Sequence, residues 1–498
     1  MLADSYDVIL IGESLPGLVA TALLARKGHR VLVIDPADPS GPQAPVFKSN
    51  GFIFPKGPLL FLGLQREGLY EKVFTELGLS LSLLKKEGAV FARPVPPFQL
   101  LLPTHRLNFS SKWEEFLEEL RREFPQEHQP AREFSKAIQE TGRILDLFHH
   151  LPFPQWRPSI KDRSHQFMDL VRYWLILRKL KSISARDYIR SYGLSLEFQK
   201  LMELVSLFFY RQPLSGLSAL DLVSLLNLIH QEVVEVREGR PNLVKIFVSR
   251  LKEHRGEVLR GAHLTGILEE RGEVRGIKLE GDRVIKGRVV LTSLAVTAPQ
   301  GLKQEKNFQS SRMRSYTMFF EIDEEVIPCA MMDHLLFTYD LGQSLEVDNF
   351  LYLFLTPREE ASSPGPDKPE RPKGKRGLRV TCLVPFDRPM LPADREALRI
   401  KIQQHLIWLM PFSDGRIGYL GDFFEDPETN KKPDGFLNPS YKLKEVLRYG
   451  TKYYTSSLRN LFLLPEDSQS LAATQEGIKS GWDLAQHLTR WLAAELRR

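Results

Sequence analysis

The sequence predicts an α/β protein whose first unit is a Rossmann-like β-α-β motif, followed by a helix-rich stretch and further strands. Residues 7–12 form a continuous apolar run, as in parallel strands that are covered on both faces. Residues 18–27 predict a helix rich in Ala and Leu, which Gly28 ends. Residues 29–35 form a second apolar strand that ends on an acid. A chain of 498 residues is long enough for roughly two to four domains.

The loop between the first strand and the helix carries a dinucleotide fingerprint. Residues 12–17 read GESLPG, which matches G-x-G-x-x-G with Ser14 at the second glycine. Gly12 allows the tight turn, Gly17 lets helix and strand pack closely, and the helix N-terminus offers N–H groups to phosphates. Asp35 follows after about 20 residues, where an acid accepts hydrogen bonds from a ribose.

Two residues of this loop leave the binding of a nucleotide open. Ser14 adds a side chain at the point of closest approach, although its hydroxyl can also bind a phosphate oxygen. Glu13 brings a carboxylate close to a site that serves an anion. The alternatives are a working nucleotide site and a retained fold whose pocket has decayed.

The residues beyond this unit predict a second, mixed region of helices and strands. Ser111 and Glu114 have the spacing of a capping box, and residues 113–124 then place apolar side chains on one helix face. Strands of a mixed sheet are predicted at residues 316–322, 350–355 and 378–384. Residues 357–377 are rich in Pro, Lys, Glu and Gly, and they predict a flexible polar insertion.

Composition and charge exclude several classes of protein. The chain has 68 Lys and Arg against 62 Asp and Glu, and this net charge of +6 predicts no nucleic-acid partner. Its two cysteines, Cys329 and Cys382, are too few for a disulfide framework and favour a cytoplasmic location. No apolar run approaches the ~20 residues that span a bilayer, so we expect at most a peripheral membrane contact. No metal-binding motif occurs, and we expect no metal.

Several later segments follow one another in the order seen in a known superfamily. Residues 49–59, SNGFIFPKGPL, resemble a strand and turn that follow its first β-α-β unit. Residues 208–228 are similar to a helical segment on its substrate side, and residues 242–291 to its central helix and strands. Residues 460–466, NLFLLPE, and 475–481, QEGIKSG, match its C-terminal patterns nLylaGD and GA..SG. With the N-terminal unit, these segments resemble the FAD-dependent amine oxidase and phytoene desaturase superfamily.

The resemblance implies a glutathione-reductase-like FAD/NAD(P)-binding domain that is discontinuous in the sequence. It places residues 1–62, 236–300 and 446–498 in this domain, and residues 63–235 and 301–445 in an interleaved α+β substrate domain. It also implies non-covalent FAD. The candidate contacts for this cofactor are Gly12, Ser14, Leu15, Pro16, Gly17, Asp35, Leu264 and Glu466.

The departures from the superfamily pattern concern the nucleotide. The C-terminal GD reads Pro465 and Glu466, where proline lacks an N–H and glutamate carries its carboxylate one methylene further out. The paired glycines after the second strand are reduced to Gly41, and those before the central helix read Gly239 and Arg240.

Two functions therefore stay open. The first is an FAD-dependent oxidoreductase resembling phytoene desaturases, which takes hydride or electrons from a long apolar substrate such as an isoprenoid or lipid. The alternative is a non-catalytic module that binds a lipid or a protein partner and has lost tight FAD binding. The Rab GDP-dissociation inhibitors share this two-domain plan without using a flavin. No catalytic residue can be named, because the flavin carries the redox chemistry. The aromatic residues that fit the substrate pocket or, equally, the core are Phe208, Phe209, Tyr210 and Tyr316.

Overall fold

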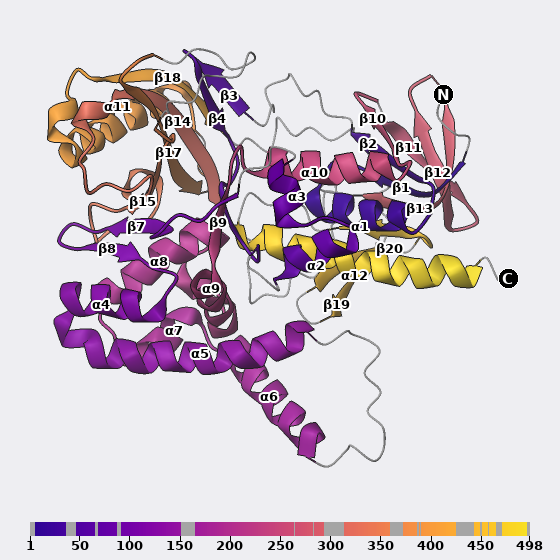
Figure 1. The fold of residues 1–498 in the computed structure, drawn as a ribbon, viewed down its shortest axis with the longest axis horizontal. Helices are drawn as coiled ribbons and strands as arrows, with labels where there is room; N and C mark the ends of the chain where they lie inside the picture. Colours follow the sequence, from indigo (N-terminus) through magenta and orange to yellow (C-terminus); the bar gives the residue numbers. More distant parts are fainter. Residues whose placement is uncertain are drawn as a thin grey trace.

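The computed structural model describes residues 5–35, 46–64, 68–86, 91–150, 165–262, 264–281, 283–292, 313–358, 372–385, 388, 390–424, 443–448, 451–456, 458–464 and 471–495. Within these residues the chain forms two large sheets, two small ones and the helices that cover them (Figure 1).

The first large sheet has nine strands and contains the predicted β-α-β unit. Its strand order is β10–β2–β1–β13–β21–β20–β19, and β11 and β12 extend it beside β13. The strands are β1 (Ser5–Ile11), β2 (Val31–Asp35), β10 (Glu257–Arg260), β11 (Leu264–Glu270), β12 (Glu273–Leu279), β13 (Val284–Thr292), β19 (Leu443–Arg448), β20 (Thr451–Ser456) and β21 (Leu461–Leu463). The five strands from β10 to β21 are parallel neighbours, which confirms the predicted Rossmann-like α/β fold class.

Helices cover one face of this sheet. Apolar side chains of α1 (Leu15–Arg26), α10 (Arg240–Glu253) and α12 (Leu471–Glu495) pack against it, together with α2 (Leu69–Glu76) and α3 (Leu81–Lys86). Figure 1 shows α12 alongside α1, although the two helices come from opposite ends of the sequence. The hairpin of β11 and β12 packs on the opposite face. The sheet is thus buried on both faces, as its continuous apolar strands predict.

The second large sheet has seven strands in the order β18–β14–β17–β16–β15–β7–β8. The strands are β7 (Phe98–Leu101), β8 (Arg106–Phe109), β14 (Met313–Asp323), β15 (His334–Phe337), β16 (Leu351–Leu355), β17 (Lys375–Pro385) and β18 (Ile417–Phe424). The three strands predicted for a mixed sheet correspond to β14, β16 and β17. Helix α11 (Pro392–Leu409) covers one face of this sheet through apolar contacts.

Strand β17 begins earlier than the sequence predicts. Lys375, Arg376 and Gly377 were expected to end the polar insertion, but they pair with β14. Arg376 is buried, and its guanidinium donates to the Thr356 carbonyl and to Asp333, which offsets the cost of burying the charge. Most of the predicted insertion, residues 359–371, lies outside the described residues.

Two small sheets join the large ones. The hairpin of β3 (Val46–Ser49) and β4 (Phe52–Pro55) packs on β14, and β5 (Leu60–Leu62), β9 (Val233–Val236) and β6 (Phe91–Ala92) form a three-stranded sheet. The remaining helices are α4 (Trp113–Glu123), α5 (His128–His150), α6 (His165–Ser182), α7 (Ala185–Arg190), α8 (Leu196–Tyr210) and α9 (Ala219–Gln231).

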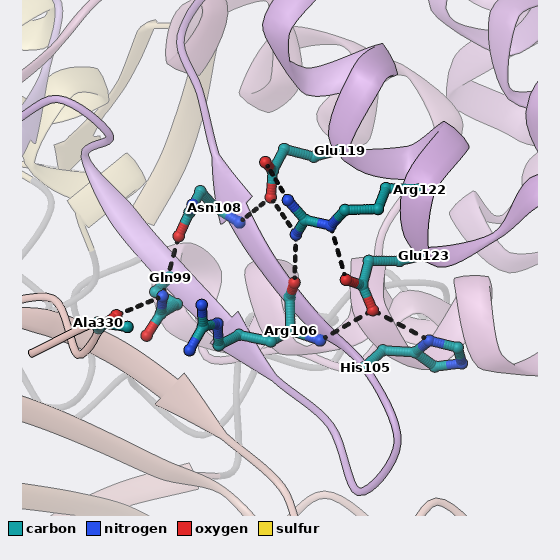
Figure 2. Close-up of polar contacts among 8 residues, drawn as sticks. All are labelled: Gln99, His105, Arg106, Asn108, Glu119, Arg122, Glu123 and Ala330. Carbon is teal, nitrogen blue, oxygen red and sulfur yellow. Dashed lines mark hydrogen bonds and ion pairs between the residues drawn. The ribbon is translucent and has the colours of Figure 1, made fainter. Parts of the chain in front are cut away.

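A polar network joins the β7–β8 hairpin, at one edge of the second large sheet, to α4 and to the segment before β15 (Figure 2). Glu119 accepts the Asn108 N–H at 2.9 Å, and Glu123 accepts the Arg106 N–H at 3.2 Å. Gln99 donates to Asn108 and to the carbonyl of Ala330, just before β15. The network therefore helps to hold β15, whose first residue is His334, in its place beside β7.

The start of α4 differs from the prediction. The helix is preceded by Lys112, whose side chain makes no capping bond, so the predicted capping box of Ser111 and Glu114 is wrong. The Ser110 hydroxyl instead donates to Glu115 at 2.6 Å and accepts the Lys112 N–H.

No helix among the described residues combines the length and apolarity that a membrane crossing needs. In the same part of the chain, no group of three or more His, Cys, Asp or Glu side chains gathers as a metal site requires. The predicted limits of the two domains remain predictions.

Candidate functional site

The fingerprint loop joins β1 to α1 at the carboxyl end of β1. Gly12 has a φ of 88°, a left-handed conformation that glycine adopts without strain. Ser14 is the N-cap of α1, and its hydroxyl accepts the Gly17 N–H at 3.2 Å. Helix α1 therefore begins at Leu15, three residues before the predicted start, with Pro16 in its first turn. The contacts predicted at residues 12–17 lie together in this loop.

Close packing leaves no room for side chains at two glycines of this site. A Cβ at Gly17 would lie 2.6 Å from the Leu10 side chain, which explains why helix and strand need glycine there. A Cβ at Gly481 of α12 would lie 2.2 Å from the carbonyl oxygen of Pro16. The C-terminal helix thus contacts the fingerprint loop directly.

The Glu13 carboxylate is paired with an arginine. Arg260, the last residue of β10, donates two hydrogen bonds to Glu13 at 2.8 and 3.0 Å. Arg240, the first residue of α10, donates to the Glu13 carbonyl at 2.8 Å. The hydrogen bond to Glu13 raises the pKa of Arg260, which stays a cation at neutral pH. The negative charge of Glu13, which would repel a phosphate, is therefore neutralised by Arg260.

Asp35 and Leu264 lie on neighbouring parts of the same sheet. Asp35 ends β2 directly opposite Arg260 of β10, and its carbonyl accepts the Gly261 N–H at 2.8 Å. Leu264 begins β11 and is buried in the core on the hairpin side of the sheet. Glu466, the remaining predicted contact, lies outside the described residues.

These residues fit the phosphates and adenosine of FAD. The N-terminus of a helix favours an anion, and two guanidinium groups lie at the same loop. Pro16 has no N–H and the Gly17 N–H is bonded to Ser14, so fewer backbone donors are offered here. Arg240 adds a positive charge at the loop, while the charge of Arg260 is paired with the Glu13 carboxylate. Asp35 stands where a ribose hydroxyl is expected.

A second group of polar residues, which sequence reasoning missed, lies on the second large sheet. The cross-strand partners His334, Phe354 and Arg379 lie in one row, and Tyr352 lies in the next row of the same face. His334, Arg379 and Tyr352 are at most 5% exposed. The opposite face of these strands packs its apolar side chains on α11, so polar residues gather on one side only.

Arg379 connects this face to the segment that follows β4. Its guanidinium donates to the carbonyls of Pro55 and Gly57, at 2.5 and 2.9 Å. The next residue, Pro58, has its carbonyl oxygen 2.4 Å from where a Cβ of Gly239 would lie. Gly239 has a φ of 65° and immediately precedes Arg240. The two groups of polar residues are thus linked through short stretches of backbone.

The sequence carried one signal of these residues. Arg379 stands between Leu378 and Val380 in an apolar strand, and His334 begins the apolar run HLLF; ionisable residues within such strands are rarely part of a simple core.

The four aromatic candidates all pack in two hydrophobic cores: Phe208, Phe209 and Tyr210 in the core that also holds Tyr352, and Tyr316 in the core beside α11. Phe208 contacts Tyr352 at 4.6 Å between ring centroids.

The family described as flavin containing amine oxidoreductase matches residues 15–326. The prolycopene isomerase 2 of an Oncidium hybrid cultivar is 23% identical over 325 residues, which are 58% of this chain and 48% of that protein. The 4,4'-diapophytoene desaturase of a Methylomonas species is 23% identical over 58% of this chain and 54% of that protein. The chain thus spans about half the length of these curated relatives.

The fold is also similar to a Rab GDI from Plasmodium falciparum. The two structures match with a TM-score of 0.53 at 11% identity, over 97% of this chain and 98% of that one. At this identity the likeness shows a shared fold.

Proposed function

The chain belongs to the flavin containing amine oxidoreductase family, and we propose that it is an FAD-dependent oxidoreductase acting on a long apolar substrate. The observation that supports FAD most directly is the loop of residues 12–17 with Arg240 and Arg260 beside it. Asp35, at the end of the neighbouring strand, completes a site for the adenosine half. The family match supports a flavin as the group that this site holds.

This chain's residues bind and orient the cofactor in the proposed site. Ser14 and the start of α1 would meet the pyrophosphate, Arg240 would add a positive charge beside it, and Asp35 would accept from the ribose. Leu264 supplies backbone beside the adenine. When bound, FAD supplies an acceptor for a hydride or for electrons.

The proposed substrate is an isoprenoid or another long, apolar molecule. The relatives in the comparison are named for prolycopene and for 4,4'-diapophytoene, both of which are long hydrocarbons. The rings of Phe208 and Tyr352 are in contact, and Tyr352 and Phe354 lie beside Arg379; we propose that a long apolar chain binds next to these rings. We further propose a cytoplasmic location with, at most, peripheral membrane contact.

Flavin content tests the proposed cofactor. The purified protein, denatured by heat or acid, should release FAD that is detected by absorbance and fluorescence. Asp35→Ala should retain much less FAD, because it removes the ribose acceptor. A protein that is colourless as purified and takes up no added FAD contradicts the proposal. Equal occupancy in Asp35→Ala shows that the adenosine lies elsewhere.

Conversion of a polyene tests the proposed substrate class. FAD-loaded protein is mixed with 4,4'-diapophytoene or prolycopene in lipid vesicles, and the change in visible absorbance is followed. Conversion of either hydrocarbon supports the proposal. An FAD-loaded protein that leaves both unchanged contradicts the proposed substrate class.

The second candidate is a non-catalytic binding module. It is supported by the reduced backbone donors at the fingerprint loop, where Pro16 and Gly17 offer no N–H to a phosphate. The fold likeness to a Rab GDI is compatible with it. This candidate predicts a protein without flavin, so the same denaturation experiment separates the two functions.

A further inference from the structure

The strongest unexplained feature of the second large sheet is its buried group of ionisable side chains. The Nδ1 atom of His334 lies 2.7 Å from the Tyr352 hydroxyl, and its Nε2 atom lies 3.4 Å from a carboxylate oxygen of Glu235. His334 is only 2% exposed. Glu235 belongs to β9, which leads through Gly239 into α10 and the cofactor loop.

Such a group is a poor way to stabilise a core. Buried charges lose hydration, and well-packed apolar residues of similar size often stabilise a protein as much or more. The group is also incompletely bonded, because His334 Nε2 and Arg379 Nε have no hydrogen-bond partner among the described residues. Buried ionisable groups of this kind are typical of sites that carry out chemistry.

We propose that Tyr352, His334 and Glu235 form a proton relay that serves the redox reaction, an inference that rests on the proposed function. In this relay Tyr352 is the group that takes the substrate's proton; its ring contacts Phe208 and lies in the row next to Phe354 and Arg379. His334 and Glu235 are positioning residues that act through it. Arg379 places a positive charge over the Tyr352 ring, 5.3 Å from its centroid.

The surroundings of His334 define which nitrogen carries its proton. The group nearest Nε2 is a carboxylate, which accepts hydrogen bonds and donates none when ionised. Nε2 therefore carries the proton, and Nδ1 is left to accept from the Tyr352 hydroxyl. The 3.4 Å separation at Nε2 is longer than a good hydrogen bond, as is common in active sites before the substrate binds.

The relay supplies the proton half of a desaturation. Forming a carbon–carbon double bond removes one proton and one hydride from adjacent carbons. The proton bonds to the Tyr352 oxygen while the phenol proton passes to His334 Nδ1, and the imidazolium is paired with the Glu235 carboxylate. The hydride leaves with its electron pair to an oxidant of the flavin class, as the proposed function requires. The extra proton then returns to water. Saturation of a double bond uses the same steps in reverse.

The proton position on His334 is tested without any substrate. Protein labelled with ¹⁵N in histidine alone is measured at pH 7.5, and the His334 signal is assigned with His334→Gln. The relay predicts a neutral ring with its proton on Nε2. It also predicts an Nδ1 signal that shifts in Tyr352→Phe and in Glu235→Gln. A proton on Nδ1, or on both nitrogens, overturns the relay, because Nδ1 then cannot accept from Tyr352.

Turnover provides the functional arm of the test. With 4,4'-diapophytoene as the probe, the relay predicts a rate about 100-fold lower in Tyr352→Phe at unchanged flavin content. Tyr316→Phe is the matched control, since its hydroxyl is bonded to Asp422 at 2.9 Å on the opposite face of the same sheet. Equal rates in wild type and Tyr352→Phe overturn the relay. A wild-type protein without flavin or turnover contradicts the proposed function instead, and the histidine signal still decides the relay.

Discussion

At the scale of single residues, Arg260 is the side chain that most directly sets the charge at the cofactor loop. It is bonded to Glu13 and lies opposite Asp35, so its single positive charge offsets one of the two negative charges near the expected phosphates. We predict that Arg260→Met lowers FAD affinity about tenfold, or about 1.4 kcal/mol, whereas Glu13→Gln raises it. Fluorescence titration with FAD measures both. Arg275→Met, which changes an arginine on β12, is the control, and unchanged affinity in Arg260→Met contradicts the prediction.

His230 should make the protein sensitive to acid. Its ring stacks on Trp113 at 3.4 Å, its Nδ1 atom is 3.1 Å from the Ser111 carbonyl, and burial lowers its pKa to about 3. The unfolded chain, with an ordinary histidine pKa of about 6.5, binds the proton first. Acid therefore favours unfolding below about pH 6.5, by up to about 1.4 kcal/mol per pH unit until the folded-state pKa is reached.

Denaturant unfolding of wild type and His230→Phe between pH 7.5 and 4.5 checks this prediction. The variant loses the bond to Ser111 and should have a lower free energy of unfolding than wild type at pH 7.5. Because only the wild type loses stability through His230 in acid, the difference between the two free energies should become smaller as the pH falls. His254→Gln, at the end of α10, is the control. If the free energies of unfolding of the two proteins differ by the same amount at every pH, His230 does not titrate as predicted.

Residues whose role is set locally could be predicted, and residues whose role depends on distant partners could not. Gly12 and Gly17 act within one turn, so their spacing alone indicates their function. The pairing of Glu13 with Arg260 joins positions far apart in the sequence. The same holds for His334 and Glu235, which only the packing of β15 near β9 brings together.

At the scale of elements, the contact of α12 with the first turn of α1 is the one most open to test. In most helices Gly→Ala is stabilising, but at Gly481 the added methyl group meets the Pro16 carbonyl, which belongs to backbone and cannot move aside. We predict that Gly481→Ala lowers the free energy of unfolding by about 1–3 kcal/mol and weakens FAD binding. Thermal unfolding and FAD titration check this.

Gly216→Ala is the control for this substitution, because the nearest atom to its added Cβ lies 3.7 Å away. If Gly481→Ala has the same free energy of unfolding as wild type, the prediction is wrong and α12 can shift without loss of stability.

The elements themselves were largely predictable, and their ends were not. Apolar periodicity located β1, β2, β14 and β16, because each is covered on both faces or packed on a helix. The beginning of each of three elements depends on a single side chain. Helix α1 begins after the Ser14 cap, α4 begins near the Ser110 bond to Glu115, and β17 begins next to the buried Arg376. Competing caps a residue apart cannot be ranked from the sequence alone.

At the scale of the whole molecule, the proposed FAD site gathers distant parts of the chain, and we predict that FAD stabilises all of them together. Its residues come from the loop after β1 and from α1, β2, α10, β10 and β11, with α12 packed beside α1. Free FAD at 100 times its dissociation constant should add about 2.7 kcal/mol to the free energy of unfolding.

Calorimetry with and without added FAD should then show the melting temperature rising with FAD concentration. Asp35→Ala should show a much smaller rise at the same concentrations. A melting temperature that does not depend on FAD contradicts this prediction.

The order of the strands in the first large sheet also bears on how the protein is made. Ser5 of β1 pairs with Lys286 of β13, and Val290 of β13 pairs with Leu461 of β21. A ribosome therefore releases β1 long before β13 has been made, and the sheet stays incomplete until residues 461–463 have also emerged. Sheets with such non-local pairing fold slowly. The nascent N-terminal unit has apolar surface to protect throughout synthesis, which makes this chain a natural client for chaperones that act during translation.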